Sequence, residues 1–244
     1  MSLQLDHAVI AVADLDTAIR DYRDLGFTVV PGGVHANRAT HNALIPFANG
    51  TYLELLAATG ERPVPGRLDF SRLLEQGEGL VGFALRTENI EAETARLQTA
   101  GFAVGEIIPG ERRRRDGTLV QWKLALLDDG FAPFLIQDVT PQDRRIPTDP
   151  ALTTHANGAT GLIRVEIAAR DLPQARARYA RLLGGSALAG ADDDQVTGEV
   201  MLRAGDVEAL FALHLIFSHG EGRSFPLDRT HHVRLVPHRL DDRS

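Results

Sequence analysis

The spacing of apolar positions changes several times within the first 60 residues, and each change predicts a new element. Residues 5–13 form an apolar run rich in alternation, which predicts a strand. Residues 14–26 then carry apolar side chains at helical spacing, with Asp14 as the N-cap and Gly26 as the stop. Three more short strands are predicted at residues 27–33, 40–47 and 51–58. The first 60 residues therefore predict a unit with the order βαβββ.

The same order of elements returns in residues 78–140. A strand at 80–87 precedes a helix at 90–101, and strands are predicted at 102–110, 118–127 and 132–139. Gly101-Phe102 ends this helix as Gly26-Phe27 ends the first one. The helix pattern DLPQARARY, which echoes DLDTAIRDY, starts a third and modified βαβββ-like module that we place at residues 158–244.

Two segments join these modules. Residues 61–77 contain two prolines and a short amphipathic helix, so they form a connector between modules 1–60 and 78–140. Residues 140–161 are polar and proline-rich, which is typical of a domain boundary. We therefore expect one domain over residues 1–140 and a third module after it.

Composition narrows the functional classes. The chain is 43% hydrophobic and 24% charged, and it has no apolar run long enough to span a membrane and no leader-like amino terminus, so we expect a cytoplasmic protein without a membrane partner. A net charge of -7 argues against a nucleic-acid partner. With no cysteine, any metal must be held by histidine, carboxylate or amide groups.

One basic run needs its own interpretation. Residues 112–115 are four arginines, and Asp116-Gly117 predicts that they lie at the tip of a hairpin. The run is either a solvated tip or a clamp for an anionic substrate. In the second case Arg115 would be a substrate-binding residue.

The candidate metal ligands lie at positions where the repeated modules differ in sequence. His7 of the first module aligns with Gly82 of the second and Arg164 of the third, so it is not part of the repeated scaffold. Glu54 is a carboxylate among apolar strand residues, and such a group must be paired, exposed or bound to a metal. Gln137 occupies about the matching strand position in the second module.

The segments DHAVIAVADLDTA, PGGVHANRATHNALIPF and GTYLELLA resemble the glyoxalase-like domains of the vicinal oxygen chelate superfamily over about residues 3–140. This superfamily includes glyoxalase I, extradiol dioxygenases and fosfomycin-resistance enzymes. The resemblance implies an α+β fold in which two βαβββ modules pair into a cupped, barrel-like mixed sheet. It also implies a divalent metal ion held from the first and fourth strands, where His7 and Glu54 match.

The second module departs from the family pattern because Gly82 has no ligand atom. His41, on the strand beside that of Glu54, is expected to supply a third ligand, and Gln137 a further one. These ligands would select only loosely among zinc, nickel, manganese and iron. The other histidines, which lack such neighbours in the sequence, are expected not to be ligands: His35, His155, His214, His219, His231, His232 and His238.

The resemblance favours a metal-dependent lyase, isomerase or dioxygenase that acts on a small oxygen-bearing organic molecule. Glu54 could also act as a catalytic base, and Asn42, Trp122 and Phe134 are expected to contact the substrate. Two alternatives stay open. The chain could be a metal-free binding protein like those that confer bleomycin resistance, or an interaction protein whose third module forms a homodimer surface.

Overall fold

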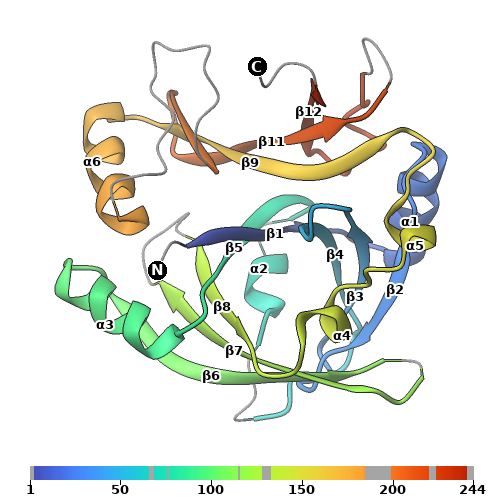
Figure 1. Ribbon diagram of the computed structural model, residues 1–244, viewed down its shortest axis with the longest axis horizontal. Coiled ribbons are helices and arrows are strands. Elements are labelled where there is room, and N and C mark those ends of the chain that lie inside the picture. The colour runs from blue at the N-terminus through green and yellow to red at the C-terminus, as the bar shows by residue number, and fades with distance from the viewer. Residues whose placement is uncertain are drawn as a thin grey trace.

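The protein is built from two sheets, shown as a lower cup and an upper layer in Figure 1. Its computed structural model describes residues 3–65, 69–75, 77–114, 116–127, 133–184, 199–219 and 224–240. The larger sheet has eight strands and the smaller one four.

The larger sheet consists of two βαβββ modules, as predicted. The first contains β1 (Gln4–Ala11), α1 (Leu15–Asp24), β2 (Val30–Val34), β3 (Thr40–Pro46) and β4 (Tyr52–Ala58). The second contains β5 (Gly79–Arg86), α3 (Ile90–Thr99), β6 (Val104–Arg113), β7 (Leu119–Leu127) and β8 (Phe134–Asp138). Asp14 caps α1 by accepting the backbone N–H of Thr17 at 2.7 Å, and Asn89 caps α3 in the same way.

The strand order β2-β3-β4-β1-β5-β8-β7-β6 places the first strand of each module at the centre of the sheet. Each first strand lies parallel to the fourth strand of its own module, and β1 and β5 join the modules antiparallel. The sheet curls until its two edges approach, where His35 and Arg112 form an isolated bridge. The predicted cupped, barrel-like α+β fold is confirmed.

The connector between the two modules packs against the inside of the cup. Its helix α2 (Ser71–Leu74) is visible within the opening of the curled sheet in Figure 1. Phe70, Leu73 and Leu74 pack against an apolar cluster on the concave face that includes Trp122 and Phe134.

The carboxyl-terminal part forms the second sheet. Its elements are α4 (Gln142–Arg145), α5 (Pro150–Thr153), β9 (Ala159–Ala169), α6 (Leu172–Leu183), β10 (Val200–Ala204), β11 (Ala209–Phe217) and β12 (Arg234–Arg239). The strand order is β10-β9-β11-β12. β9 is parallel to β10 and antiparallel to β11, and β11 is parallel to β12. These are the pairings of β4-β1-β5-β8, so the sheet repeats the centre of the cup.

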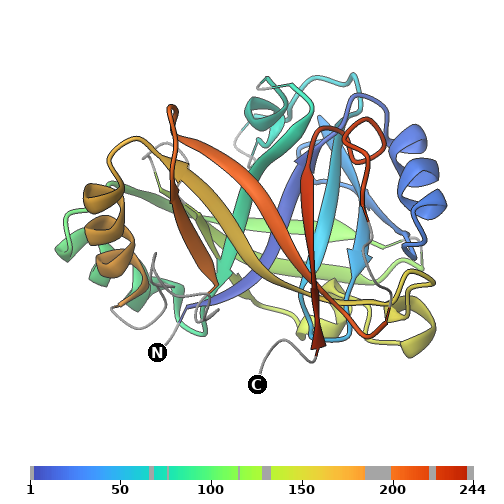
Figure 2. The same ribbon diagram turned by 90° about the horizontal axis from the view of Figure 1, so that it is seen from above.

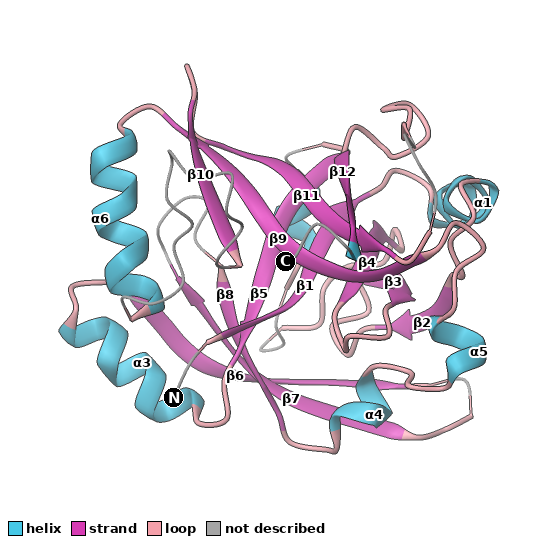
Figure 3. Cartoon of the chain, turned by 45° about the horizontal axis from the view of Figure 1, so that its top comes forward, coloured by secondary structure: helices cyan, strands magenta, loops and turns pink. Residues whose placement is uncertain are grey.

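The second sheet covers the convex side of the cup, as the view from above shows (Figure 2). One apolar core continues through both layers, with Leu53 and Phe83 from the cup and Val165 and Leu213 from the second sheet, all fully buried. Burying each such side chain contributes about 1.5 to 3 kcal/mol. α3 and α6 lie on one flank of this core, and α1 and α5 on the other (Figure 3). A division of the chain between residues 140 and 158 stays a prediction.

Candidate functional site

A cavity lies on the concave face of the cup, between the two modules. It encloses about 380 Å³, part of which is open to solvent. The residues that line it come from both modules, from the residue before α2 and from α4. They are His7, His35, Asn42, Leu44, Tyr52, Glu54, Phe70, Arg112, Trp122, Leu124, Phe134, Ile136 and Arg145.

Strand alternation selects which side chains reach this cavity. On β4, Leu53 and Leu55 enter the core shared with the second sheet, so Tyr52 and Glu54 point the opposite way, into the cup. β1 lies beside β4 with Val9 opposite Glu54, and His7 enters the same side. The predicted pair of His7 and Glu54 therefore meets in the cavity.

His7 is held on three sides. Its Nδ1 atom lies 2.7 Å from Asp6 Oδ1, its ring stacks on Tyr52 at 4.4 Å, and its Nε2 atom lies 3.5 Å from Glu54 Oε2. Asp6 also accepts two hydrogen bonds from Arg145, of 2.8 and 2.9 Å. Burial alone would raise the pKa of Asp6, but Arg145 and His7 outweigh it and hold this pKa well below its usual range. An ionised Asp6 can only accept, so Nδ1 of His7 donates, and a neutral ring directs the lone pair of Nε2 toward Glu54.

His35 approaches Glu54 from the other side, although the sequence did not single it out. Its Nε2 atom lies 3.6 Å from Glu54 Oε1, and its Nδ1 atom lies 2.9 Å from Thr40 Oγ1. Burial lowers the pKa of His35, against the opposing effect of Glu54, and so favours the neutral ring that a metal requires. The sequence signal that could have identified His35 is its position directly after β2, the strand at the edge that closes the cup against β6.

Asn42 connects these groups. Its amide nitrogen donates to Glu54 Oε1 at 2.6 Å and lies 3.3 Å from His35 Nε2. Its Oδ1 atom is buried without a hydrogen-bond partner and lies against Gly32, where a Cβ atom would come within 1.9 Å of it. Glycine at position 32 is therefore required for this placement of the amide.

The donors around Glu54 fit a divalent ion in chemical type. Two histidine nitrogens and a carboxylate are a common ligand set, and ligand atoms bound to one tetrahedral zinc ion lie about 3.4 Å apart. The distances of 3.5 and 3.6 Å from the histidine nitrogens to the Glu54 oxygens agree with that spacing. Within the described residues, however, no three His, Asp or Glu side chains already form a metal-ready cluster. Side-chain adjustment, with Asn42 releasing Glu54, would be needed.

Three residues expected at the site lie elsewhere or are not described. His41 is not among the residues that line the cavity, because alternation along β3 turns Asn42 inward and His41 to the other face. The side chain of Gln137 bonds the backbone of Ile90 and Glu88, and it does not line the cavity either. Arg115 lies outside the described residues.

The second module contributes an apolar wall. Trp122 and Phe134, both expected to contact the substrate, line the cavity together with Leu124 and Ile136. The indole of Trp122 lies across Gly110, where a Cβ atom would come within 2.2 Å of its Nε1 atom. Gly82, which aligns with His7, lies beside the ring of Phe134. The half of the site that could have carried further ligands is thus hydrophobic.

Four other histidines have partners away from the cavity. His155 contacts the backbone of Pro46 and Thr28, at 3.0 and 2.9 Å. His214 pairs with His238 on the second sheet, and His231 lies 3.0 Å from Glu78. That these histidines are not ligands stays a prediction.

Comparison with known proteins points to one family. A family model described as "Glyoxalase-like domain" matches residues 5–183. No curated protein sequence matches the chain. Among the described residues, no helix is long and apolar enough to cross a membrane.

A solved structure that is similar over nearly the whole chain supports the fold. A hypothetical protein from Staphylococcus aureus is 20% identical and has a TM-score of 0.76, with 96% of this chain and 99% of that chain covered. Methylmalonyl-CoA epimerase from Mycobacterium tuberculosis is also similar, with 26% identity and a TM-score of 0.42. The aligned part covers 56% of this chain and 88% of the epimerase chain.

Proposed function

The chain belongs to the glyoxalase-like domain family, and on that premise we propose that it is a divalent-metal-dependent enzyme acting on a small oxygen-bearing organic molecule. In this proposal His7, His35 and Glu54 hold the ion. The reaction belongs to the lyase, isomerase or dioxygenase type.

The convergence of two histidine nitrogens on one carboxylate supports this proposal. Nitrogens of His7 and His35 face different oxygens of Glu54, at 3.5 and 3.6 Å. A divalent cation between these atoms would be coordinated by both nitrogens and attracted by the carboxylate. The two Nδ1 atoms are already held by Asp6 and Thr40, which is how protein metal sites orient their histidines.

The mechanism divides the work between the two walls of the cavity. A divalent ion bound here would act as a Lewis acid that stabilises negative charge on a substrate oxygen. Tyr52 and the Asp6–Arg145 pair keep His7 in place. Trp122 and Phe134 exclude water from the apolar part of the substrate and orient it.

Glu54 has a second role in this proposal. When Glu54 leaves the ion, Asn42 can donate again to its Oε1 atom, as it does at 2.6 Å in the structure, and so orient the carboxylate while the other oxygen is released. The released oxygen can accept a proton from a substrate carbon or hydroxyl group within the cavity. Asn42 would then hold the protonated side chain in position.

The proposal also includes the partner, the cellular location and the oligomeric state of the protein. Its partner is a small molecule, and we place its activity in the cytoplasm. A homodimer formed through the carboxyl-terminal sheet remains part of the proposal.

One observation favours a second candidate, a metal-free small-molecule binding protein. Asn42 already donates to Glu54 Oε1 and lies 3.3 Å from His35 Nε2, so it partly occupies the place of a cation. The apolar wall around Phe134 would suit ligand binding without catalysis.

Elemental analysis of protein purified without a chelator separates the two candidates. The enzyme proposal predicts about one divalent ion per chain, and loss of that ion in Glu54→Gln, which keeps the shape but not the charge. Metal content below about a tenth of an equivalent, with no uptake when zinc is added, would contradict it and favour the binding protein.

A further inference from the structure

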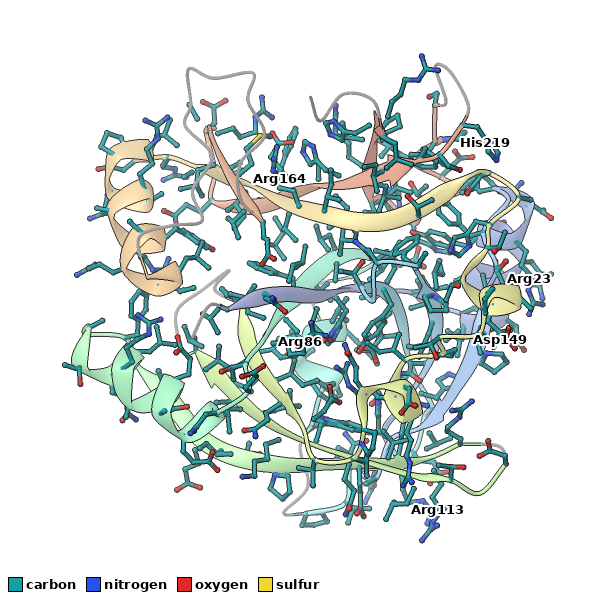
Figure 4. All side chains as sticks on the ribbon, viewed as in Figure 1. Arg23, Arg86, Arg113, Asp149, Arg164 and His219 are labelled. Atoms are coloured by element: carbon teal, nitrogen blue, oxygen red, sulfur yellow. The ribbon has the colours of Figure 1, made fainter. Side chains whose placement is uncertain are left out.

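The arginine run at the edge of the cup divides into one buried and at least one exposed side chain. Arg112 lines the cavity with 6% of its surface exposed. Arg113, the next residue, points away from the molecule at its lower edge (Figure 4), and its guanidinium donates to the carbonyl of Gly117, at 3.3 Å. The sequence interpretation of a hairpin tip therefore fails for Arg112, which belongs to the cavity.

Arg112 is a buried cation without an acidic partner. Its guanidinium donates to two backbone carbonyls, those of Gly32 and Arg145, both at 2.8 Å. In the described part of the chain, no carboxylate lies within ion-pair distance of it. Burial lowers the pKa of Arg112, yet a guanidinium stays charged in proteins.

Arg145, the other arginine of the cavity, is different. Asp6 and Asp138 each accept two hydrogen bonds from it, and Tyr52 accepts one. Its charge is balanced by these acids. Of the two cavity arginines, only Arg112 carries a charge that a ligand could neutralise.

The surroundings of Arg112 show what kind of ligand could do so. Gly110 and Arg112 are two positions apart on β6 and share one face, and the indole of Trp122 lies across Gly110. A flat apolar surface is thus adjacent to the guanidinium. Phe134 and Leu124 continue this wall around the cavity.

We propose that Arg112 selects the ligand of this cavity, and that the ligand is a small organic carboxylate with an apolar tail. The carboxylate pairs with Arg112, and the tail packs on Trp122 and Phe134. This deepens the proposed function and depends on it for the location of the site. It does not depend on the metal, because Arg112 has no ion-pair partner among the described residues.

The experiment compares phenylacetate with phenylacetamide, which has nearly the same shape and no charge. Trp122 is the only tryptophan of the chain, so its fluorescence reports binding in the cavity. A charge-assisted hydrogen bond predicts that the acid binds at least about 10-fold more tightly than the amide. The preference should disappear in Arg112→Met and persist in Arg113→Met, the exposed control.

Arg112→Met leaves two buried carbonyls without a donor, so circular dichroism must first show that it folds. If it does not fold, Arg112→Lys takes its place. Lysine keeps the positive charge but cannot form the two parallel hydrogen bonds that a guanidinium makes with a carboxylate. The preference for the acid over the amide should therefore fall. Equal binding of acid and amide by the unmodified protein, no binding of either, or an unchanged preference in the folded Arg112 variant would overturn the proposal.

Both titrations are run with a chelator and again with added zinc. If the proposed metal site is wrong, zinc will have no effect while the preference for the acid remains. If the assignment of Arg112 is wrong, zinc will bind and the acid and amide will not differ. The two failures are therefore distinguishable.

Discussion

The two modules that form the cup have the same fold but fill their concave faces differently. The first contributes His7, His35, Asn42 and Glu54, a connected polar group around one carboxylate. The second contributes Trp122, Leu124, Phe134 and Ile136, an apolar wall, with Arg112 as its charged member.

The difference shows how a repeated fold can separate two tasks. In the first module, strand alternation brings polar side chains to the cavity, where second partners such as Asp6 and Thr40 hold them. In the second, Gly82 and Gly110 carry no side chain, and the aromatic rings lie beside or across them. The first half thus positions charge, and the second shapes the space for a ligand.

Removing the anchor of the polar half should have the largest effect. Arg145→Met removes the arginine that pairs with buried Asp6 and with partly buried Asp138, and breaking such a pair costs about 3 to 5 kcal/mol. Urea denaturation measures this loss of unfolding free energy. Arg114→Met, at a partly exposed position of the hairpin, is the control, with an expected change of no more than about 1 kcal/mol. Similar values for both variants would mean that the network does not anchor this half.

Truncating the apolar half should destabilise the protein and spare the metal site. Phe134→Ala removes a ring that is 8% exposed, and such changes cost roughly 3 kcal/mol. Zinc uptake per folded chain should remain unchanged, since Phe134 supplies no ligand atom. Loss of zinc binding in this folded variant would show that the two halves are not separate.

A pair of glycine variants tests the wall on a finer scale. A Cβ atom at Gly110 would overlap the indole of Trp122, whereas one at Gly82 would meet Phe134 at an ordinary contact distance of 3.8 Å. Gly110→Ala should therefore displace Trp122, change its fluorescence and cost about 1 to 3 kcal/mol. Gly82→Ala should change stability by less than about 0.5 kcal/mol. Equal changes in stability and fluorescence in the two variants would contradict this account of the wall.

The spacing of apolar residues in the sequence was sufficient to predict most of the fold. The helix cap at Asp14, the Gly-Phe steps after both helices and the repeated strand order predicted the paired modules, because these signals are local. The third module was less predictable. Its β9 and β11 pair as β1 and β5 do, and this pairing depends on contacts between strands distant in sequence.

The candidate site was predictable only in part. His7 and Glu54 stood out because they break the pattern of their strands, and the structure brings them together. His41 was chosen over His35 because it lies on the strand beside that of Glu54, but its neighbour Asn42 is the residue that alternation directs inward. His35 follows β2 and reaches Glu54 only because the sheet curls and closes against Arg112, which no local pattern reveals.

The central claim is that His35, with His7 and Glu54, binds a divalent ion. Calorimetric titration of metal-stripped protein with zinc tests it, with His35→Ala compared against His41→Ala. We predict one ion per chain for the parent and for His41→Ala. His35→Ala should lose more than the roughly 10- to 100-fold affinity expected of a residue that only orients a ligand. His35→Ala that binds zinc as tightly as the parent, or an equal loss in His41→Ala, would contradict the claim.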